Sequence, residues 1–269
     1  MSKRLTNKLA ALKSEGRAGL VPFFSVGDPD LETSRDAILA AAEAGADVIE
    51  LGVPFSDPIA DGTVIQESSQ RALAAGSSLA RVLDMVVWLR ARTDVPLVLF
   101  GYYNPFFRYG EENFARDAAA AGADAVLCTD LPPEEAADMT AACRRYDLDR
   151  IFLLAPTSNE DRMKAVAEQA SGFVYMVSVT GVTGARSNAP VGIGDLVSRA
   201  RAVTGLPIGV GFGISTPEQA ADVARYAELV VVGSALVRRM FEAGPSGAVA
   251  ASRDFIRELR GGIDAVRRP

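Results

Sequence analysis

The chain has 269 residues, 49% of them hydrophobic and 23% charged, which is enough apolar material for one large core. The formal net charge is −6 and no run of basic residues interrupts it, so the surface repels nucleic acids and anionic membranes. No stretch approaches the roughly 18 consecutive apolar residues of a membrane helix, and no apolar signal segment follows the charged N-terminus. These features predict a globular protein that binds no nucleic acid and no membrane.

The sequence contains no histidine and only two cysteines, Cys128 and Cys143, whose neighbours lack metal-ligand spacing. Without histidine, the usual general base, the commonest zinc ligand and every Ser-His or Cys-His nucleophile pair are missing. Acid-base chemistry is therefore left to carboxylates and tyrosines, and we expect no metal site. The sparse cysteines predict a reduced, cytoplasmic protein.

Eight short apolar runs recur along the chain, at residues 20–25, 48–51, 97–101, 125–128, 151–155, 174–178, 208–211 and 229–232. They are continuous instead of alternating, which is typical of parallel strands covered on both faces. Apolar residues at helical spacing predict crossover helices at residues 34–44, 79–89, 114–121, 136–146, 163–169 and 217–224, with room for one more between the second and third strands. The pattern predicts an α/β protein, a (β/α)8 TIM barrel that forms a single domain over residues 1–269.

One junction occurs twice, because residues 44–47 and 121–124 both read Ala-Gly-Ala-Asp. A glycine just past a helix can take the left-handed conformation that ends the helix before the next strand. We interpret the junction as an internal repeat of the strand-helix unit.

Glu50 stands inside the apolar second strand, where a carboxylate is costly unless it is paired or its pKa rises. Two interpretations are open: an acid-base group with a pKa near neutrality, or a partner of an arginine within the barrel. Asp57 and Asp61 follow in a loop rich in proline and glycine, where aspartates commonly form turns. Residues just after each strand build the active site of such barrels, so this loop is a candidate.

Residues 211–215 and 232–235 follow the seventh and eighth strands, and small residues there let backbone N–H groups approach a ligand. Both segments lead into helices, whose N-termini favour anions, so together they predict a phosphate site, although glycines also serve tight turns. Residues 178–192 form a long loop of glycines and small polar residues, which is either a lid over the substrate or an idle surface loop.

The sequence closely resembles the tryptophan synthase alpha subunit family, through segments that cover nearly the whole chain from the first strand to the eighth. The run from residue 50 to residue 61 is highly specific, whereas the glycine loops alone are shared with many phosphate-binding barrels. The matching segments are Pro22-Phe23, Gly27-Asp28-Pro29, residues 50–58 and 60–62, Tyr102-Tyr103-Asn104-Pro105, Asp130-Leu131-Pro132, residues 181–184, residues 211–215 and Gly233-Ser234.

The resemblance implies a lyase of tryptophan biosynthesis that cleaves indole-3-glycerol phosphate to indole and glyceraldehyde 3-phosphate, with Glu50 and Asp61 as its catalytic carboxylates. It also implies a beta subunit in an alpha2beta2 assembly, which carries pyridoxal phosphate and receives the indole, while this chain itself has no cofactor. Positions around the substrate match Phe23, Ile65, Phe100, Tyr102, Tyr175, Thr183 and Phe212, and phosphate contacts match Gly184, Gly213, Gly233 and Ser234.

Cleavage of the bond between the indole ring and the glycerol phosphate carbon is a retro-aldol-like step. It requires a proton delivered to ring carbon C3 and a proton removed from the adjacent hydroxyl, and Glu50 can do both if its pKa lies near neutrality. Asp61 fits the stabilisation of positive charge at the ring nitrogen. A Schiff-base aldolase needs a lysine at a strand end and a zinc aldolase needs histidines, and the sequence offers neither.

Three places depart from the pattern of the family. Thr63 replaces a common proline after Asp-Gly, Phe100-Gly101 replaces a common Met-Thr or Leu-Met type pair, and Thr129 replaces a frequent proline. The first is expected to loosen the catalytic loop and the second to alter the volume of the indole pocket.

Two other functions remain open from the sequence. One is a stand-alone lyase that releases free indole for another pathway; the other is a non-catalytic subunit that only activates a beta partner, against which the presence of Glu50 and Asp61 argues. We expect the loops at residues 54–58, 103–107 and 130–133 to form an apolar rim that docks a beta subunit, with aromatic anchors such as Phe107. The alternative is that Phe106 and Phe107 pack against the following helix.

Overall fold

The computed structural model describes residues 1–177, 193–211 and 213–266. Eight parallel strands close into a barrel in which each strand pairs with the next in sequence and β8 pairs with β1. The predicted barrel is confirmed, with strand ends that differ from the predicted ones by at most two residues. The strands are β1 (Gly19–Ser25), β2 (Ile49–Gly52), β3 (Leu97–Gly101), β4 (Ala125–Cys128), β5 (Asp149–Leu154), β6 (Val174–Val177), β7 (Ile208–Gly211) and β8 (Leu229–Val232).

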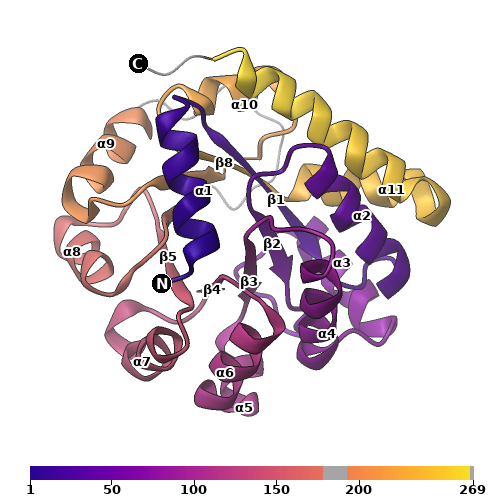
Figure 1. Ribbon diagram of the computed structural model, residues 1–269, viewed down its shortest axis with the longest axis horizontal. Helices are drawn as coiled ribbons and strands as arrows, with labels where there is room; N and C mark the ends of the chain where they lie inside the picture. The colour runs from indigo at the N-terminus through magenta and orange to yellow at the C-terminus, as the bar shows by residue number, and fades with distance from the viewer. Residues whose placement is uncertain (178–192, 212, 267–269) are drawn as a thin grey trace.

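A ring of helices surrounds the strands, and α1 lies across one end of the barrel (Figure 1). The additional helix expected between the second and third strands is α3. The helices are α1 (Lys3–Ser14), α2 (Leu31–Glu43), α3 (Thr63–Ala74), α4 (Leu79–Arg90), α5 (Tyr103–Tyr109), α6 (Glu111–Ala121), the 3-10 turn η1 (Pro133–Glu135), α7 (Ala137–Arg145), α8 (Glu160–Gln169), α9 (Ile193–Thr204), α10 (Pro217–Ala224) and α11 (Ser234–Asp264).

Alternate residues of each strand point into and out of the barrel, and both faces are buried. Outward side chains pack against the helices in the larger apolar cluster. Helix α1 closes the N-terminal end of the barrel, because its Leu5 and Leu12 are buried in the inner cluster. The residues of the strands, and Val48 directly before β2, that belong to that inner cluster are Val21, Val48, Val98, Ala125, Leu127, Ile151, Leu229 and Val231.

The two Ala-Gly-Ala-Asp junctions have the same structure. Gly45 and Gly122 take positive φ angles of 109° and 102°, as predicted for the residue that ends the helix. The following aspartates bind back to the preceding strand: Asp47 Oδ2 accepts a hydrogen bond from Leu20 N at 3.0 Å, and Asp124 Oδ2 accepts one from Leu97 N at 2.9 Å. Each carboxylate therefore ties the start of one strand to the start of its neighbour.

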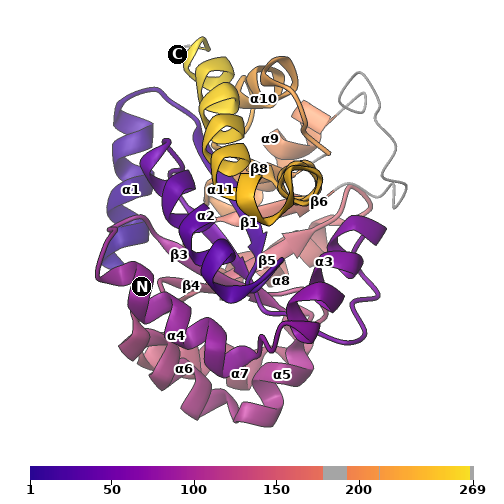
Figure 2. The same ribbon diagram turned by 90° about the vertical axis from the view of Figure 1, so that its right-hand side faces the viewer.

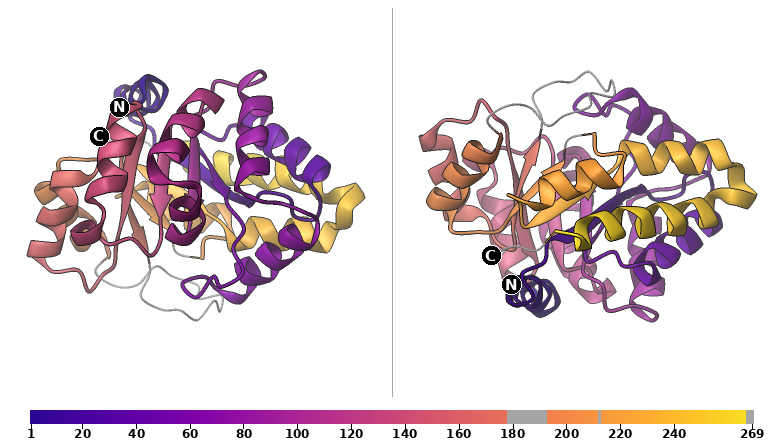
Figure 3. Two further views of the ribbon diagram at one scale, coloured as in Figure 1. Left: turned by 90° about the horizontal axis from the view of Figure 1, so that it is seen from below. Right: turned by 90° about the horizontal axis from the view of Figure 1, so that it is seen from above.

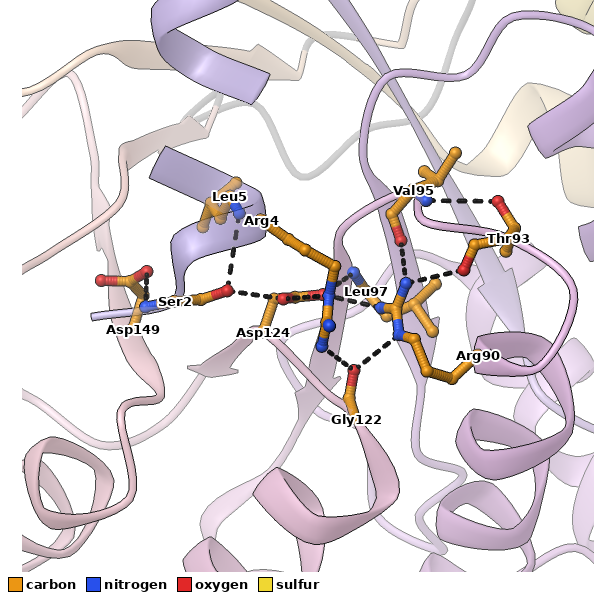
Figure 4. Close-up of polar contacts among 10 residues, drawn as sticks. All are labelled: Ser2, Arg4, Leu5, Arg90, Thr93, Val95, Leu97, Gly122, Asp124 and Asp149. Carbon is orange, nitrogen blue, oxygen red and sulfur yellow. Dashed lines mark hydrogen bonds and ion pairs between the residues drawn. The ribbon is translucent and has the colours of Figure 1, made fainter. Parts of the chain in front are cut away.

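Asp124 is the centre of an ion-pair cluster at the N-terminal end of the barrel (Figure 4). Its buried carboxylate accepts hydrogen bonds from Ser2 Oγ, from Arg4 Nε at 3.0 Å and from Arg90 Nη2 at 2.8 Å. Ser2 also caps α1, since its hydroxyl accepts from Leu5 N. The cluster fixes α1 and α4 to the barrel at the end opposite to the strand C-termini.

Residues 103–107, predicted as a solvent-facing loop, begin helix α5 instead. Phe106 is fully buried and stacks on Phe114 of α6 with 4.4 Å between ring centroids. The proposed alternative of packing against the following helix is therefore right for Phe106. Phe107 is 60% exposed and contacts the ring of Tyr103, so it alone of the pair faces solvent.

Helix α11 bends sharply at Gly244, where φ is 69° and ψ is 172°, and Pro245 follows the bend. Its two arms consequently run in different directions, as Figure 2 and Figure 3 show. No single helix in the described parts of the chain is long and apolar enough to cross a membrane. Helices α3 and α4 reach that length and apolar character only when taken together, and the chain bends by 91° between them.

Candidate active site

Glu50 lies on β2 with its side chain on the inner wall of the barrel. Strand pairing places it between Phe23 of β1 and Val98 of β3. The residue two positions earlier, Val48, belongs to the inner cluster, and the two-residue period of the strand directs Glu50 the same way. The carboxyl group is thus enclosed by apolar side chains of three strands.

No arginine partner meets Glu50 in the described structure. Its side chain is 1% exposed, and Oε1 has no hydrogen-bond partner. The buried arginine of the barrel, Arg150, lies on the outward face of β5 beside Phe152 and donates to Val126 O. Burial therefore raises the pKa of Glu50 to about 8. Among the described residues no arginine pairs with Glu50, so of the two interpretations the raised pKa is the one that their arrangement supports.

An aromatic cavity lies at the C-terminal ends of the first three strands; Glu50 is not among the residues that line it, although its strand neighbour Phe23 is. Phe23, Ile65, Phe100, Tyr102 and Asp61 all line it, so the structure brings together five of the predicted site residues. The rings of Phe23 and Phe100 meet edge to face with their centroids 5.1 Å apart. The cavity has a volume of about 10 Å³, so these side chains must separate before a bicyclic ring can enter.

Gly52, which ends β2, makes room for one wall of the cavity. A Cβ at this position would lie 2.5 Å from the ring of Phe23 and 2.9 Å from Phe24 O. Any other residue would push Phe23 out of its place on the inner wall.

Asp61 is held by Tyr102, which follows β3. The Tyr102 hydroxyl donates to Asp61 Oδ2 at 3.0 Å and accepts from Ala60 N at 3.0 Å. Gln66 of α3 supports the same loop, because its Nε2 donates to Asp61 O at 2.9 Å. Burial raises the pKa of Asp61 to about 6, and the hydrogen bond from Tyr102 opposes that rise. Asp57, by contrast, is exposed: its carboxylate accepts a hydrogen bond from Ser56 Oγ and its backbone carbonyl one from Ile59 N, as expected of a turn residue.

Tyr175 of β6 faces the two carboxylates from the far side of the barrel. Burial raises its pKa well above the ordinary value, and the charges of Glu50 and Asp61 raise it further. Gly211 on the neighbouring strand is required here, since a Cβ would collide with the Tyr175 hydroxyl. Tyr175 is therefore a neutral phenol within the electrostatic reach of both carboxylates.

The candidate phosphate residues lie after β7 and β8. Gly213 is exposed with a φ of 57°, and Gly233 precedes helix α11, in which Ser234 is the first residue. Gly233 provides no side-chain cap, so the N–H groups of the first turn of α11 stay available to an anion. Three predicted residues, Thr183, Gly184 and Phe212, lie outside the described residues.

The departures from the family pattern have local explanations. Gly101 leaves room for Phe106, because a Cβ there would lie 2.9 Å from that ring. Thr129 N donates to Gly101 O at 2.9 Å, a bond that proline cannot make. Thr63 is the first residue of α3, a position that accepts proline and threonine alike.

The sequence placed Tyr102 only among the residues around the substrate and did not reveal that its hydroxyl also holds Asp61. Nor did it reveal the role of Gln66, whose contact with Asp61 O spans five positions along the chain. A hydroxyl at the end of β3, next to the aspartate loop of β2, was a signal that could have suggested the Tyr102 contact. Within residues 1–177, 193–211 and 213–266 no group of three histidine, cysteine, aspartate or glutamate side chains could hold a metal ion.

Comparison with known proteins bears on this site as a whole. A sequence profile described as "Tryptophan synthase alpha chain" matches residues 9–260. The tryptophan synthase alpha chain of Geobacter sulfurreducens is 54% identical to this chain, and the alignment covers 97% of this chain and 98% of that one. The tryptophan synthase alpha chain of Citrifermentans bemidjiense is 52% identical, and the alignment covers 97% of each chain.

Solved structures agree. Tryptophan synthase subunit alpha from Legionella pneumophila superposes with a TM-score of 0.92 at 37% identity, covering 99% of this chain and 100% of that one. A chain of Mycobacterium tuberculosis tryptophan synthase superposes with a TM-score of 0.90 at 40% identity, and the superposition covers 98% of this chain and 99% of that one. The resemblance in the motifs is thereby confirmed: the chain belongs to the tryptophan synthase alpha chain family.

Proposed function

We propose that the chain cleaves indole-3-glycerol phosphate into indole and glyceraldehyde 3-phosphate, with Glu50 as the proton carrier and Asp61 as the second carboxylate. Membership in its family makes the chain a carbon-carbon lyase of tryptophan biosynthesis. The observation that carries the role of Glu50 is its buried carboxyl group, whose Oε1 is unpartnered, on the strand next to Phe23, which lines the aromatic cavity.

Glu50 changes its protonation state twice in the proposed reaction. With a pKa of about 8 it is protonated by about ten to one at pH 7, so it can deliver a proton to ring carbon C3. The resulting carboxylate then takes the proton of the adjacent hydroxyl while the carbon-carbon bond breaks and its electron pair returns to the ring. The hydroxyl carbon becomes the aldehyde, and Glu50 ends as it began.

Asp61 stabilises the intermediate in this proposal. Protonation at C3 makes the ring an indolenine-like cation, and a carboxylate near the ring nitrogen lowers its energy. A pKa of about 6 keeps Asp61 ionised at neutral pH, and the hydrogen bond from Tyr102 orients it. The two carboxylates thus have different protonation states at one pH because their surroundings differ.

The remaining residues bind the substrate in this proposal. Phe23, Ile65, Phe100 and Tyr102 surround the indole ring, with Tyr175, Thr183 and Phe212 completing the site. The phosphate rests against the backbone of Gly213, Gly233 and Ser234, together with Gly184. Both proton transfers are assigned to side chains, so the mechanism uses no cofactor, and pyridoxal phosphate is expected only in the beta partner. The free, buried Cys128 and Cys143 fit the proposed cytoplasmic location.

The test is indole release from indole-3-glycerol phosphate by purified Glu50→Gln and Asp61→Asn. Each variant keeps the side-chain volume and removes the ionisable group, so we expect turnover to fall by at least about 100-fold with little change in substrate affinity. Near wild-type turnover of either folded variant would contradict its assigned role.

We further propose that the C-terminal rim of the barrel docks a beta subunit, as an alpha2beta2 assembly requires. Two apolar side chains are exposed there: Phe107 at 60%, and Ile59 at 87% within the loop that carries Asp61. Contacts to that loop in the complex would order Asp61 and raise lyase turnover.

Titration of the chain with a beta subunit, following association and indole release, tests the assembly. We expect Phe107→Ala to weaken association by more than about 1 kcal/mol. If the wild type neither binds nor accelerates, the stand-alone lyase replaces this proposal. If Phe107→Ala matches the wild type at the same beta concentration, the complex stands and the anchor is elsewhere.

A further inference from the structure

A second cavity lies at the opposite end of the barrel from the candidate active site. Its volume of about 480 Å³ is within the roughly 300–1,000 Å³ of small-molecule sites. It opens between α1 and the segments that lead into β7 and β8. None of the described residues proposed for catalysis or phosphate binding lines it.

The walls of this cavity are apolar and fixed. Leu9 and Leu12 come from α1, and Leu206 and Pro207 come from the turn before β7. Leu12 is buried in the inner cluster of the barrel, and Leu9 packs against that cluster. A ligand here would contact surface that is anchored to the barrel and need not order a loop.

The mouth of the cavity is positively charged. Four cationic side chains line it, Lys13, Arg17, Arg201 and Arg225, against the single carboxylate of Glu228. Arg17 pairs with Asp47 at 3.1 Å and Arg201 with Glu228 at 2.9 Å.

Lys13 and Arg225 form no ion pair with any described residue, and the buried Nε of Arg201 has no hydrogen-bond partner. Two cations with no ion pair among the described residues therefore stand at this cavity in a chain whose net charge is −6. A cavity with low-dielectric walls concentrates such a local field, so it attracts anions even though the whole surface repels them.

We propose that this cavity binds a small amphipathic anion, free in solution, whose apolar body lies against Leu9, Leu12, Leu206 and Pro207. Its carboxylate or sulfonate group is directed to Lys13 and Arg225. An uncharged apolar molecule would leave the cations without a partner, and a small hydrophilic anion would leave the apolar walls exposed, so only a ligand with both parts satisfies the whole cavity.

The probe is 1-anilinonaphthalene-8-sulfonate, titrated by fluorescence, with N-phenyl-1-naphthylamine as the uncharged molecule of nearly the same shape. We expect Lys13→Gln combined with Arg225→Gln to weaken the sulfonate about tenfold and to leave the amine unchanged. The matched control combines Arg238→Gln with Arg257→Gln, which removes two exposed charges on α11 outside the cavity.

A second pair of variants tests the location by volume instead of charge. Ala10 of α1 is exposed and lines the cavity, so Ala10→Phe should fill it and abolish binding of both probes. Ala11 is exposed on the same helix and does not line the cavity, so Ala11→Phe should bind as the wild type does. Thermal unfolding midpoints verify that each variant is folded.

Three results would overturn the proposal. The wild type could show no saturable binding of the sulfonate, the cavity and control double variants could lose the same amount of sulfonate affinity, or binding could survive Ala10→Phe. The last result would place the probe elsewhere, for example in the aromatic cavity at the other end of the barrel. Equal loss in the charge pairs would mean that the probe senses only overall charge.

Discussion

Glu50 should make the folded chain less stable as pH rises. The folded chain holds the pKa of this carboxyl at about 8, whereas its ordinary value is 4.5, so between these two pH values folding takes up a proton. Stability from this source is complete below pH 4.5 and is lost progressively up to pH 8. Each pH unit in this window costs about 1.4 kcal/mol, which makes the loss about 3 kcal/mol at pH 7 and about 4 kcal/mol at pH 8.

Glu50→Gln removes the ionisable group and keeps its shape. We expect the variant to gain stability over the wild type by about 3 kcal/mol between pH 5 and pH 8, which is roughly 5–10 °C in unfolding midpoint for a chain of this size. The assay is thermal unfolding of both proteins at several pH values. The same variant should have lost lyase turnover, so the residue would contribute to catalysis while opposing stability.

The matched control is Glu135→Gln, which changes an exposed glutamate of η1. Its stability difference from the wild type should not depend on pH in this range. A constant difference between Glu50→Gln and the wild type from pH 5 to pH 8 would refute the reasoning, since it would mean that the folded chain does not raise the pKa of Glu50.

Five further outcomes concern the site and the barrel. The pH profile of kcat/KM should be bell-shaped with limbs near 6 and 8, because Asp61 must be ionised and Glu50 protonated. The variant Tyr102→Phe removes the hydrogen bond that lowers the pKa of Asp61, so it should move the acid limb up by roughly one pH unit. Ser234→Asp should weaken inhibition by glycerol phosphate through charge repulsion, and an unchanged inhibition constant would exclude the proposed phosphate position. Asp124→Asn should destabilise the barrel by about 3–5 kcal/mol in denaturant titration, because it leaves Arg4 and Arg90 without their buried partner. Gly101→Thr, although closer to the family pattern, should cost about 1–3 kcal/mol in the same measurement because its side chain meets Phe106.

The barrel could be predicted from the sequence because its signal is repeated and local. Continuous apolar strands follow from burial on both faces, and the observed inner and outer clusters provide that burial. Helix α5 escaped prediction because the Asn104-Pro105 dipeptide directly after a strand is typical of turns. What makes it helical is tertiary contact, chiefly the burial of Phe106 against Phe114, and no local pattern encodes that contact.

The site was predicted less completely than the fold. The family resemblance placed Phe23, Phe100 and Tyr102 around one ring of the substrate, and the three residues line one cavity. The hydrogen bond between Tyr102 and Asp61 spans 41 positions and depends on the path of a loop, so side-chain spacing could not reveal it. The small volume of the cavity likewise depends on how the lining side chains pack, which the sequence does not show.

Glu50 and Asp124 show most clearly what sequence alone could not decide. Both are carboxylates beside apolar strands, and both are almost completely buried. Asp124 is neutralised by Arg4, 120 positions away, and by Arg90, 34 positions away, because α1 and α4 bring these side chains to the N-terminal end of the barrel. Glu50 receives no such partner from the described residues, since it faces the inner wall where apolar and aromatic side chains from the neighbouring strands surround it. One carboxylate is therefore a structural anchor and the other keeps a raised pKa suited to proton transfer, and the difference arises from which helices reach each end of the barrel.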